Sequence, residues 1–127
     1  MNALKKMLSK YAGYSFRSSC AETPEWKSFC TKLKNAMKKE ISEEYPDLEL
    51  AAWSKGHFDV SGFVTRKSDG AIFYFSFRDV RTVNATGQQM YRSARNLKDY
   101  CGGHNQWTTG ENLLAAIAKA RYEFARR

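Results

Sequence analysis

The residues best suited to chemistry lie in one polar stretch toward the C-terminal end of the chain. Two adjacent glycines free the backbone there, so consecutive N–H groups could converge on an anion. The stretch also leads toward an expected helix N-terminus, where the helix dipole favours negative charge. The candidate anion-binding loop comprises Gly102, Gly103, His104, Asn105 and Trp107. The alternative is an ordinary structured loop whose amide side chains satisfy backbone groups.

Basic residues precede this loop, beginning at the end of an expected strand. Arg78 and Arg81 flank Asp79, so both arginines could contact phosphate while Asp79 holds one in place. Equally, Asp79 and either arginine could form a salt bridge of little energetic value. The sequence therefore predicts a basic face that binds nucleic acid or a partner, made of Arg78, Arg81, Arg92, Arg95 and Lys98.

One expected strand carries side chains that a hydrolytic metal site would use. His57, Asp59 and Ser61 alternate along it, and a histidine and a carboxylate on neighbouring pleats can bind metal or pass protons. Carboxylates that could complete a nuclease-like site are Asp79, Asp99 and Glu49. No pair of carboxylates with a lysine stands out at strand spacing. We therefore expect neither catalysis nor a bound metal.

The cysteines indicate free thiols. Cys20, Cys30 and Cys101 are widely spaced, and the chain has no Cys-x-x-Cys pair. A zinc site needs four ligands at characteristic spacing. Cys101 and His104 resemble a nucleophile with its base, but a turn with two glycines fixes that geometry poorly and supplies no orienting third group. The glycines also lack the Gly-Lys-Ser/Thr that completes a phosphate-binding loop, so we expect no cofactor.

The elements that must position these residues form an α+β pattern. Thr23 and Pro24 are typical of a helix start, Gly70 suits a left-handed turn position between two strands, and Thr108 with Glu111 fits a capping box. Four strands are expected at Leu48–Trp53, His57–Thr65, Ala71–Arg78 and, less regularly, Met90–Ala94.

These patterns predict a single α+β domain over residues 1–127. It comprises a basic N-terminal helix and loop over 1–20, a helix over 23–44, an antiparallel sheet of three to four strands over 48–94, and a C-terminal helix over 109–126. We expect the helices to pack on one face of the sheet, because each has one apolar stripe to bury.

Charge and composition narrow the class of partner. The chain has 127 residues, a net charge of +8 and 14% aromatic residues, which argues against disorder. The excess charge falls in residues 1–20 and 66–98, while the middle helix is nearly balanced. Such an excess favours nucleic acid, phosphate-bearing ligands or an acidic protein surface. No apolar run reaches the roughly 18 residues of a membrane span, and the start lacks a signal-peptide core, so a cytoplasmic protein without membrane partners is expected.

Three segments resemble small, mostly uncharacterised proteins and modules of phages, plasmids and conjugative elements, particularly those of gut bacteria. The segments are His57–Phe63, Tyr74–Arg81 and Lys98–Thr109, and the match covers roughly residues 47–120. The resemblance implies an accessory role on a mobile element. Small proteins in that setting often disarm host defences, anti-CRISPR proteins among them.

The resulting hypothesis is a non-enzymatic accessory protein of the host bacterial cytoplasm. It would act in counter-defence by binding a nucleoprotein effector or its nucleic acid through the basic face. The positive net charge argues against DNA mimicry, which needs a carboxylate-rich surface. The alternatives are a stand-alone DNA- or RNA-binding module and, further off, a metal-dependent nuclease or a nucleotide-binding or nucleotide-modifying protein.

Overall fold

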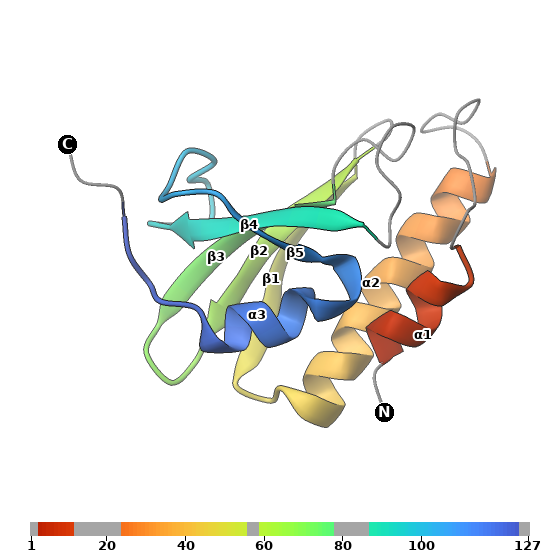
Figure 1. Cartoon of the computed structure of the whole chain (residues 1–127), viewed down its shortest axis with the longest axis horizontal. Coiled ribbons are helices and arrows are strands. Elements are labelled where there is room, and N and C mark those ends of the chain that lie inside the picture. Colours follow the sequence, from red (N-terminus) through yellow and green to blue (C-terminus); the bar gives the residue numbers. More distant parts are fainter. Residues whose placement is uncertain (1–2, 12–23, 56–58, 78–86, 125–127) are drawn as a thin grey trace.

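A five-stranded antiparallel sheet with helices against it forms the described part of the chain (Figure 1). The structure is a computed structural model that describes residues 3–11, 24–55, 59–77 and 87–124. The strands follow one another across the sheet in chain order, and every neighbouring pair is antiparallel. The elements are α1 (Ala3–Ser9), α2 (Pro24–Glu44), β1 (Leu48–Lys55), β2 (Val60–Arg66), β3 (Ala71–Phe77), β4 (Gln88–Ala94), β5 (Gln106–Thr109), the 3-10 turn η1 (Gly110–Asn112) and α3 (Leu113–Lys119).

The expected middle helix is confirmed as α2. It begins at Pro24, whose missing N–H costs nothing in the first turn, and it ends at Glu44, two residues before Pro46. Its predicted apolar stripe is buried, with the rings of Trp26 and Phe29 stacked at 5.6 Å. The expected N-cap, Thr23, lies outside the described residues.

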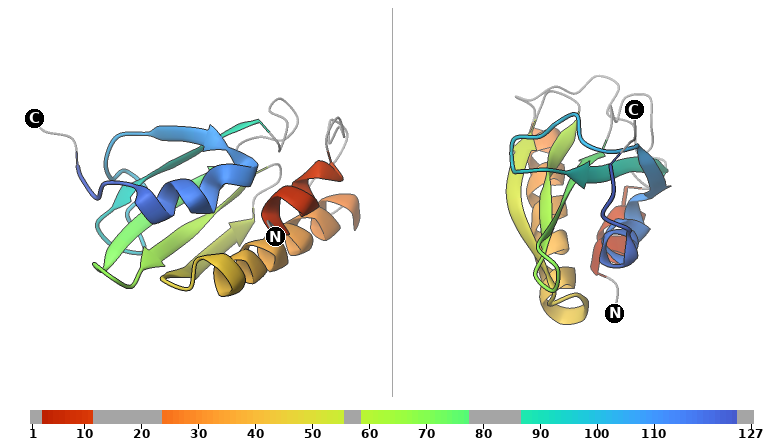
Figure 2. Two further views of the ribbon diagram at one scale, coloured as in Figure 1. Left: turned by 60° about the horizontal axis from the view of Figure 1, so that its bottom comes forward. Right: turned by 90° about the vertical axis from the view of Figure 1, so that its left-hand side faces the viewer.

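The helices share one core with one face of the sheet. In β3 the three phenylalanines, Phe73, Phe75 and Phe77, all point to this core, while Tyr74 faces the other way. Apolar residues of α1, α2 and α3 complete the same cluster. Figure 2 shows α1 and α3 together on this side of the sheet. The helices therefore cover one face, and the other face is left to the segment between β4 and β5.

The sheet has five strands, whereas the sequence predicts three to four. The extra strand is β5, in a stretch that the sequence placed in a polar loop and a helix cap. It pairs with β4 through Met90 opposite Trp107 and Gln89 opposite Thr108. The capping-box prediction is wrong for the same reason, because Thr108 lies within the strand and accepts a hydrogen bond from the Asn112 side chain at 3.0 Å.

The C-terminal helix is shorter than the expected 109–126. It spans Leu113–Lys119, and the chain turns to an extended conformation at Ala120. The residues that follow contact β4 instead: the Glu123 N–H donates to Ser93 Oγ at 3.1 Å, and the Tyr122 hydroxyl donates to the Ala94 carbonyl at 2.6 Å. These contacts outweigh helix propensity, which is a weak preference.

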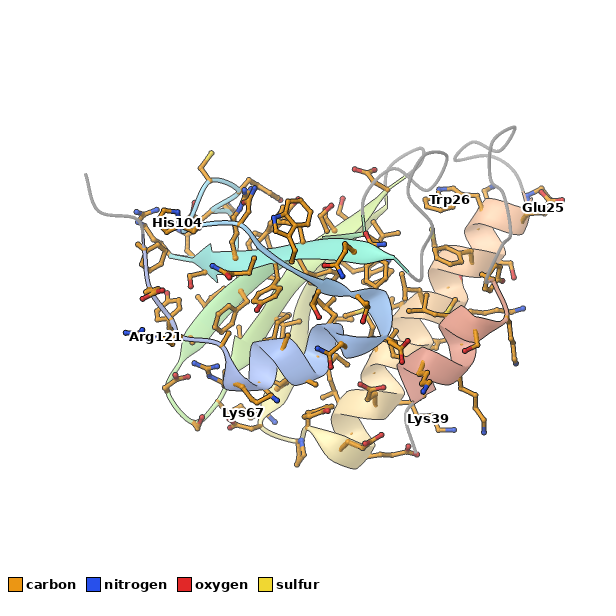
Figure 3. The ribbon with its side chains drawn as sticks, viewed as in Figure 1. Glu25, Trp26, Lys39, Lys67, His104 and Arg121 are labelled. Atoms are coloured by element: carbon orange, nitrogen blue, oxygen red, sulfur yellow. The ribbon has the colours of Figure 1, made fainter. Side chains whose placement is uncertain are left out.

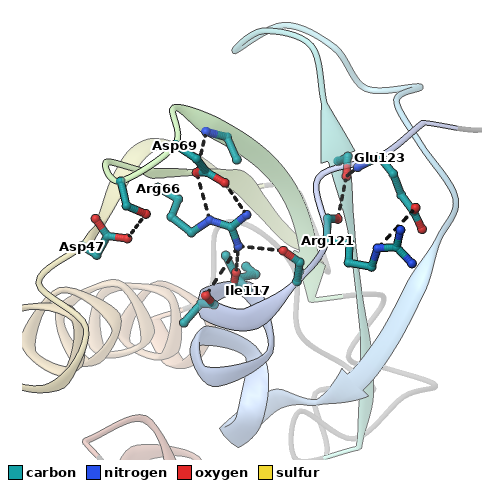
Figure 4. A network of polar contacts seen from close by, with 11 residues as sticks. Asp47, Arg66, Asp69, Ile117, Arg121 and Glu123 are labelled. Carbon is teal, nitrogen blue, oxygen red and sulfur yellow. Dashed lines mark hydrogen bonds and ion pairs between the residues drawn. The ribbon is translucent and has the colours of Figure 1, made fainter.

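Arg66 fixes the end of α3 against the sheet (Figure 4). It is buried at the end of β2, and its Nη1 donates to the carbonyls of Ile117 and Ala120, each at 2.8 Å. Asp69, in the turn after β2, accepts from Nε at 3.0 Å and from Nη2 at 2.7 Å. A cation at a helix C-terminus complements the helix dipole. Gly70 completes this turn at φ +73°, as the sequence predicts.

Candidate nucleic-acid interface

Arg92, which the sequence predicts on the basic face, makes its contacts with other residues of the same molecule. It lies on the sheet face opposite the helices, with its guanidinium 5.0 Å from the centre of the Tyr74 ring. Nη1 donates to Asn105 Oδ1 at 2.9 Å, and Nη2 donates to the Tyr100 carbonyl. Arg92 therefore ties the returning loop to the sheet.

Arg95 and Lys98 lie in that loop, on its exposed side. Arg95 forms an ion pair with Asp99 at 3.2 Å and lies 4.5 Å from the centre of the Phe124 ring. Hydrogen bonds from the Arg95 and Cys101 backbone N–H groups hold the pKa of Asp99 below its usual range, so this carboxylate stays charged. The charge of Asp99 therefore offsets part of the positive charge that Arg95 and Lys98 give to this loop.

The glycines of the candidate anion-binding loop serve close packing against β4. A Cβ on Gly102 would lie 1.8 Å from the Ser93 carbonyl oxygen, and one on Gly103 would lie 2.5 Å from the Glu123 carbonyl oxygen. The Gly103 N–H already donates to the Ser93 carbonyl at 2.8 Å. The stretch leads into β5 rather than a helix N-terminus, which removes the dipole argument for anion binding.

His104 and Trp107 do not share a surface. His104 lines a small cavity of about 150 Å³ with Gln106 and Arg121 on the helix side of the sheet (Figure 3). Trp107 follows Gln106 in β5, so its side chain points to the opposite face, beside Met90. The predicted loop is thus divided between two sides of the sheet.

Several candidates from the sequence lie outside the described residues: Arg78, Arg81, Asp79, His57 and Cys20. Asp59 is exposed just before β2, and Ser61 is half-buried within it. Within residues 3–11, 24–55, 59–77 and 87–124, no three His, Cys, Asp or Glu side chains are grouped to hold a metal ion.

A lysine-lined groove runs between α2 and β1. Lys27, Lys34 and Lys38 line it along one side of the helix, with Trp53 of β1 among the other lining residues, and its volume is about 560 Å³. Lys27 and Lys38 are eleven positions apart on the helix, which corresponds to about 16 Å at a rise of 1.5 Å per residue. The lining residues that belong to the described part of the chain include no carboxylate.

A second basic groove lies between α1 and α2. Its volume is about 330 Å³, and its described lining residues include the lysines Lys6, Lys10 and Lys39 and the carboxylate Glu43. Figure 3 labels Lys39 on α2. Met7 and Ala36 are buried where the two helices meet, and α1 also lies beside η1. We call the lysines of the two grooves together the lysine surface: Lys6, Lys10, Lys27, Lys34, Lys38 and Lys39.

The sequence did not predict the lysine surface, because the positive and negative charges of α2 nearly cancel when they are counted along the chain. In space they separate. Glu40 is 1% exposed and faces the core, where its Oε1 accepts the Leu4 N–H at 2.9 Å. Glu25 and the pair Glu43 and Glu44 lie at the two ends of the helix. A signal was present, since Glu40 follows Leu33 and Met37 at helical spacing and so falls on the buried stripe.

No protein-family model, curated protein or solved structure matches this chain. The resemblance to proteins of mobile elements thus depends on the three sequence segments alone. None of the helices in the described ranges is long and apolar enough to span a membrane.

Proposed function

We propose that the protein is a non-enzymatic binding protein that holds the nucleic acid of a nucleoprotein complex against its lysine surface. The observation that carries this proposal is the groove between α2 and β1, where Lys34 and Lys38 line the same side of the helix and the lining residues that the structure describes include no carboxylate. Lysine is a compact point charge on a flexible stem, which suits a phosphate backbone without demanding a fixed geometry. The proposed binding site therefore lies on the helices and not on the basic face that the sequence predicts.

Electrostatics support a polyanion as the ligand. Lys34 and Lys38 are one turn apart on α2. The three residues between them include no acidic side chain that could pair with either lysine. Binding of such lysines to phosphates releases condensed counterions, which makes affinity strongly dependent on salt. A regular polyanion uses the whole groove, whereas an acidic protein patch would need matched hydrogen-bond geometry that flexible lysines supply poorly.

The test compares two double variants that each lower the net charge of +8 by two units. Lys34→Gln/Lys38→Gln removes charge from the groove, and Lys119→Gln/Arg121→Gln removes it from exposed positions at the far end of α3. Fluorescence anisotropy with short labelled RNA and DNA measures the affinity of each. We expect the groove variant to bind about tenfold more weakly or worse at about 0.15 M salt, and the control to change little.

Equal losses in the two variants would mean that net charge alone attracts nucleic acid, and the lysine surface would have no special role. An unchanged groove variant would contradict the proposal directly. Failure to bind either RNA or DNA, with capture of an acidic protein partner instead, would also overturn it.

The resemblance of three sequence segments to mobile-element proteins supports a role of this binding in counter-defence as part of the proposal. In that setting the protein would grip the nucleic acid of a nucleoprotein effector, such as a guide RNA, in the bacterial cytoplasm. A pull-down from host lysate, with and without RNase, tests this role. Recovery of a defence complex that RNase releases is expected, and recovery of neither nucleic acid nor a defence protein would contradict it.

A further inference from the structure

The sheet face opposite the helices carries an aromatic cluster. Phe63 of β2 and Tyr74 of β3 are cross-strand neighbours on this face. Tyr100, from the loop between β4 and β5, lies over both, with ring centres 5.4 Å from Phe63 and 5.5 Å from Tyr74. Arg92 lies beside Tyr74 on the same face. Apolar rings thus form a layer that the helices do not cover.

Exposed apolar side chains concentrate in the same region. Of the four large exposed hydrophobic residues in the described part of the chain, three lie between positions 97 and 107: Leu97 at 42%, Tyr100 at 54% and Trp107 at 47%. Trp107 shares the face of Tyr100, because it lies opposite Met90, and Met90 lies opposite Ser76. Two exposed aromatic rings, those of Tyr100 and Trp107, thus lie on the sheet face opposite the helices.

The two exposed rings are held in place by the fold. Tyr100 is fixed by edge contacts to two rings and by the hydrogen bond from Arg92 to its carbonyl. Trp107 is mounted on a paired strand. A surface that is ordered before binding loses little conformational entropy when a ligand docks.

The geometry points to this face as a stacking platform for the bases of single-stranded nucleic acid. Every base offers a π-face that stacks on an aromatic side chain, and such stacking tolerates any base sequence. Duplex bases are already stacked and cannot use these rings.

This inference rests on the proposed function, since it takes nucleic acid as the ligand and adds that the ligand is single-stranded. The positive net charge of the protein is complementary to the negative charge of a nucleic-acid strand. The platform supplies base stacking on one face of the sheet, and the lysine surface supplies phosphate contacts on the helix side. The two contributions are separable by mutation.

The test uses labelled oligo-U and oligo-dT, which do not self-pair, together with a duplex of equal length. Trp107→Thr removes the ring and keeps a strand-forming residue. We expect this variant to bind both single strands about 5- to 150-fold more weakly, the cost of one base-stacking contact, and to bind the duplex as before. Trp107→Phe, which keeps a ring, should bind within a few fold of the parent.

Leu97→Ala is the matched control, because it removes an exposed apolar side chain of the same segment that has no ring. Its single-strand affinity should stay unchanged. Equal losses in Leu97→Ala and Trp107→Thr would overturn base stacking in favour of a general apolar contact. Circular dichroism confirms that each variant folds.

The two proposals fail in different ways. If Trp107→Thr leaves the preference for single strands unchanged while Lys34→Gln/Lys38→Gln weakens every probe, the platform is disproved and the lysine surface stands. If only Trp107→Thr has an effect, the lysine surface is disproved. A difference between oligo-U and oligo-dU in the parent protein identifies which sugar the site favours, and loss of binding to both oligo-U and oligo-dT with Trp107→Thr supports the platform.

Discussion

Arg92 and Asn105 join the end of β4 to the start of β5 through a hydrogen bond of 2.9 Å between Nη1 and Oδ1. The same guanidinium binds the carbonyl of Tyr100 and lies over the ring of Tyr74. One side chain thus holds the loop that presents Tyr100. The arginine expected to contact a ligand directly instead positions the residue proposed to do so.

Arg92→Lys tests this positioning role. Lysine keeps the charge but lacks the planar fork that reaches Asn105 and the Tyr100 carbonyl together. We expect faster hydrogen exchange in residues 96–104, a loss of about 1 kcal/mol in the free energy of unfolding, and weaker single-strand binding with unchanged duplex binding. Unchanged exchange in the loop would contradict the role.

Gly102→Ala tests the close approach of the loop to β4. The added Cβ would lie 1.8 Å from the Ser93 carbonyl oxygen, so backbone must move, and we expect a loss of about 3 kcal/mol in the free energy of unfolding. Gly70→Ala is the control. Gly70 has φ +73° and open space around it, so only backbone conformation is strained there, at about 1 kcal/mol. Urea unfolding measures both, and equal losses would refute the packing account.

Glu40→Gln tests the buried carboxyl beneath α1. Burial raises the pKa of Glu40 above its usual 4.5, while the Leu4 N–H and nearby charges shift it less. The folded state therefore favours the protonated form, so this group's contribution to stability is full below the unfolded pKa and is lost as pH rises through the folded pKa. Glutamine keeps the acceptor without the charge, so the variant should match the parent near pH 4 and be at least as stable at pH 7.

Glu43→Gln, at an exposed position one turn further along α2, provides the comparison for Glu40. Because its side chain is exposed, this substitution should change stability by no more than a few tenths of a kcal/mol. Thermal unfolding of both variants across this range measures the effect. A Glu40→Gln protein that is less stable than the parent at neutral pH would show that the charged carboxylate is needed for docking α1.

Asp69→Asn tests the ion pair at the β2–β3 turn. The hydrogen bonds from Arg66 lower the pKa of Asp69 from 3.8 to about 2. The pair therefore stabilises the fold above about pH 4, and the contribution is lost as pH falls toward 2. The variant should be less stable than the parent at pH 7 and should approach it at the acid end. Urea midpoints at the two pH values measure this, and a constant difference would contradict the assignment.

The parts of the fold that follow from local pattern were predictable. Pro24 and the apolar stripe of α2 define a helix without reference to the rest of the chain, and Gly70 marks the turn between β2 and β3. β5 was not predictable in this way, because four polar and aromatic residues gain strand structure only by pairing with β4. The early end of α3 likewise depends on Arg66 and Ser93, which lie far away in sequence.

The candidate site was predicted only in part. The sequence singled out the segment after β4 as unusual, but it assigned the glycines to anion binding and Arg92 to an exposed face. Their actual partners, the Ser93 carbonyl and Asn105, become neighbours only when β4 and β5 pair. The lysine surface was missed because charge was counted by segment, without placing Glu40 on the buried stripe of α2.

The most direct test of the lysine surface is the salt dependence of nucleic-acid binding. For the parent protein, the logarithm of the association constant for a short duplex should fall linearly with the logarithm of salt concentration. In Lys34→Gln/Lys38→Gln the slope should be shallower by about 1.8, the value for two lost phosphate contacts. In Lys119→Gln/Arg121→Gln it should match the parent. A groove variant with the parental slope would contradict the account.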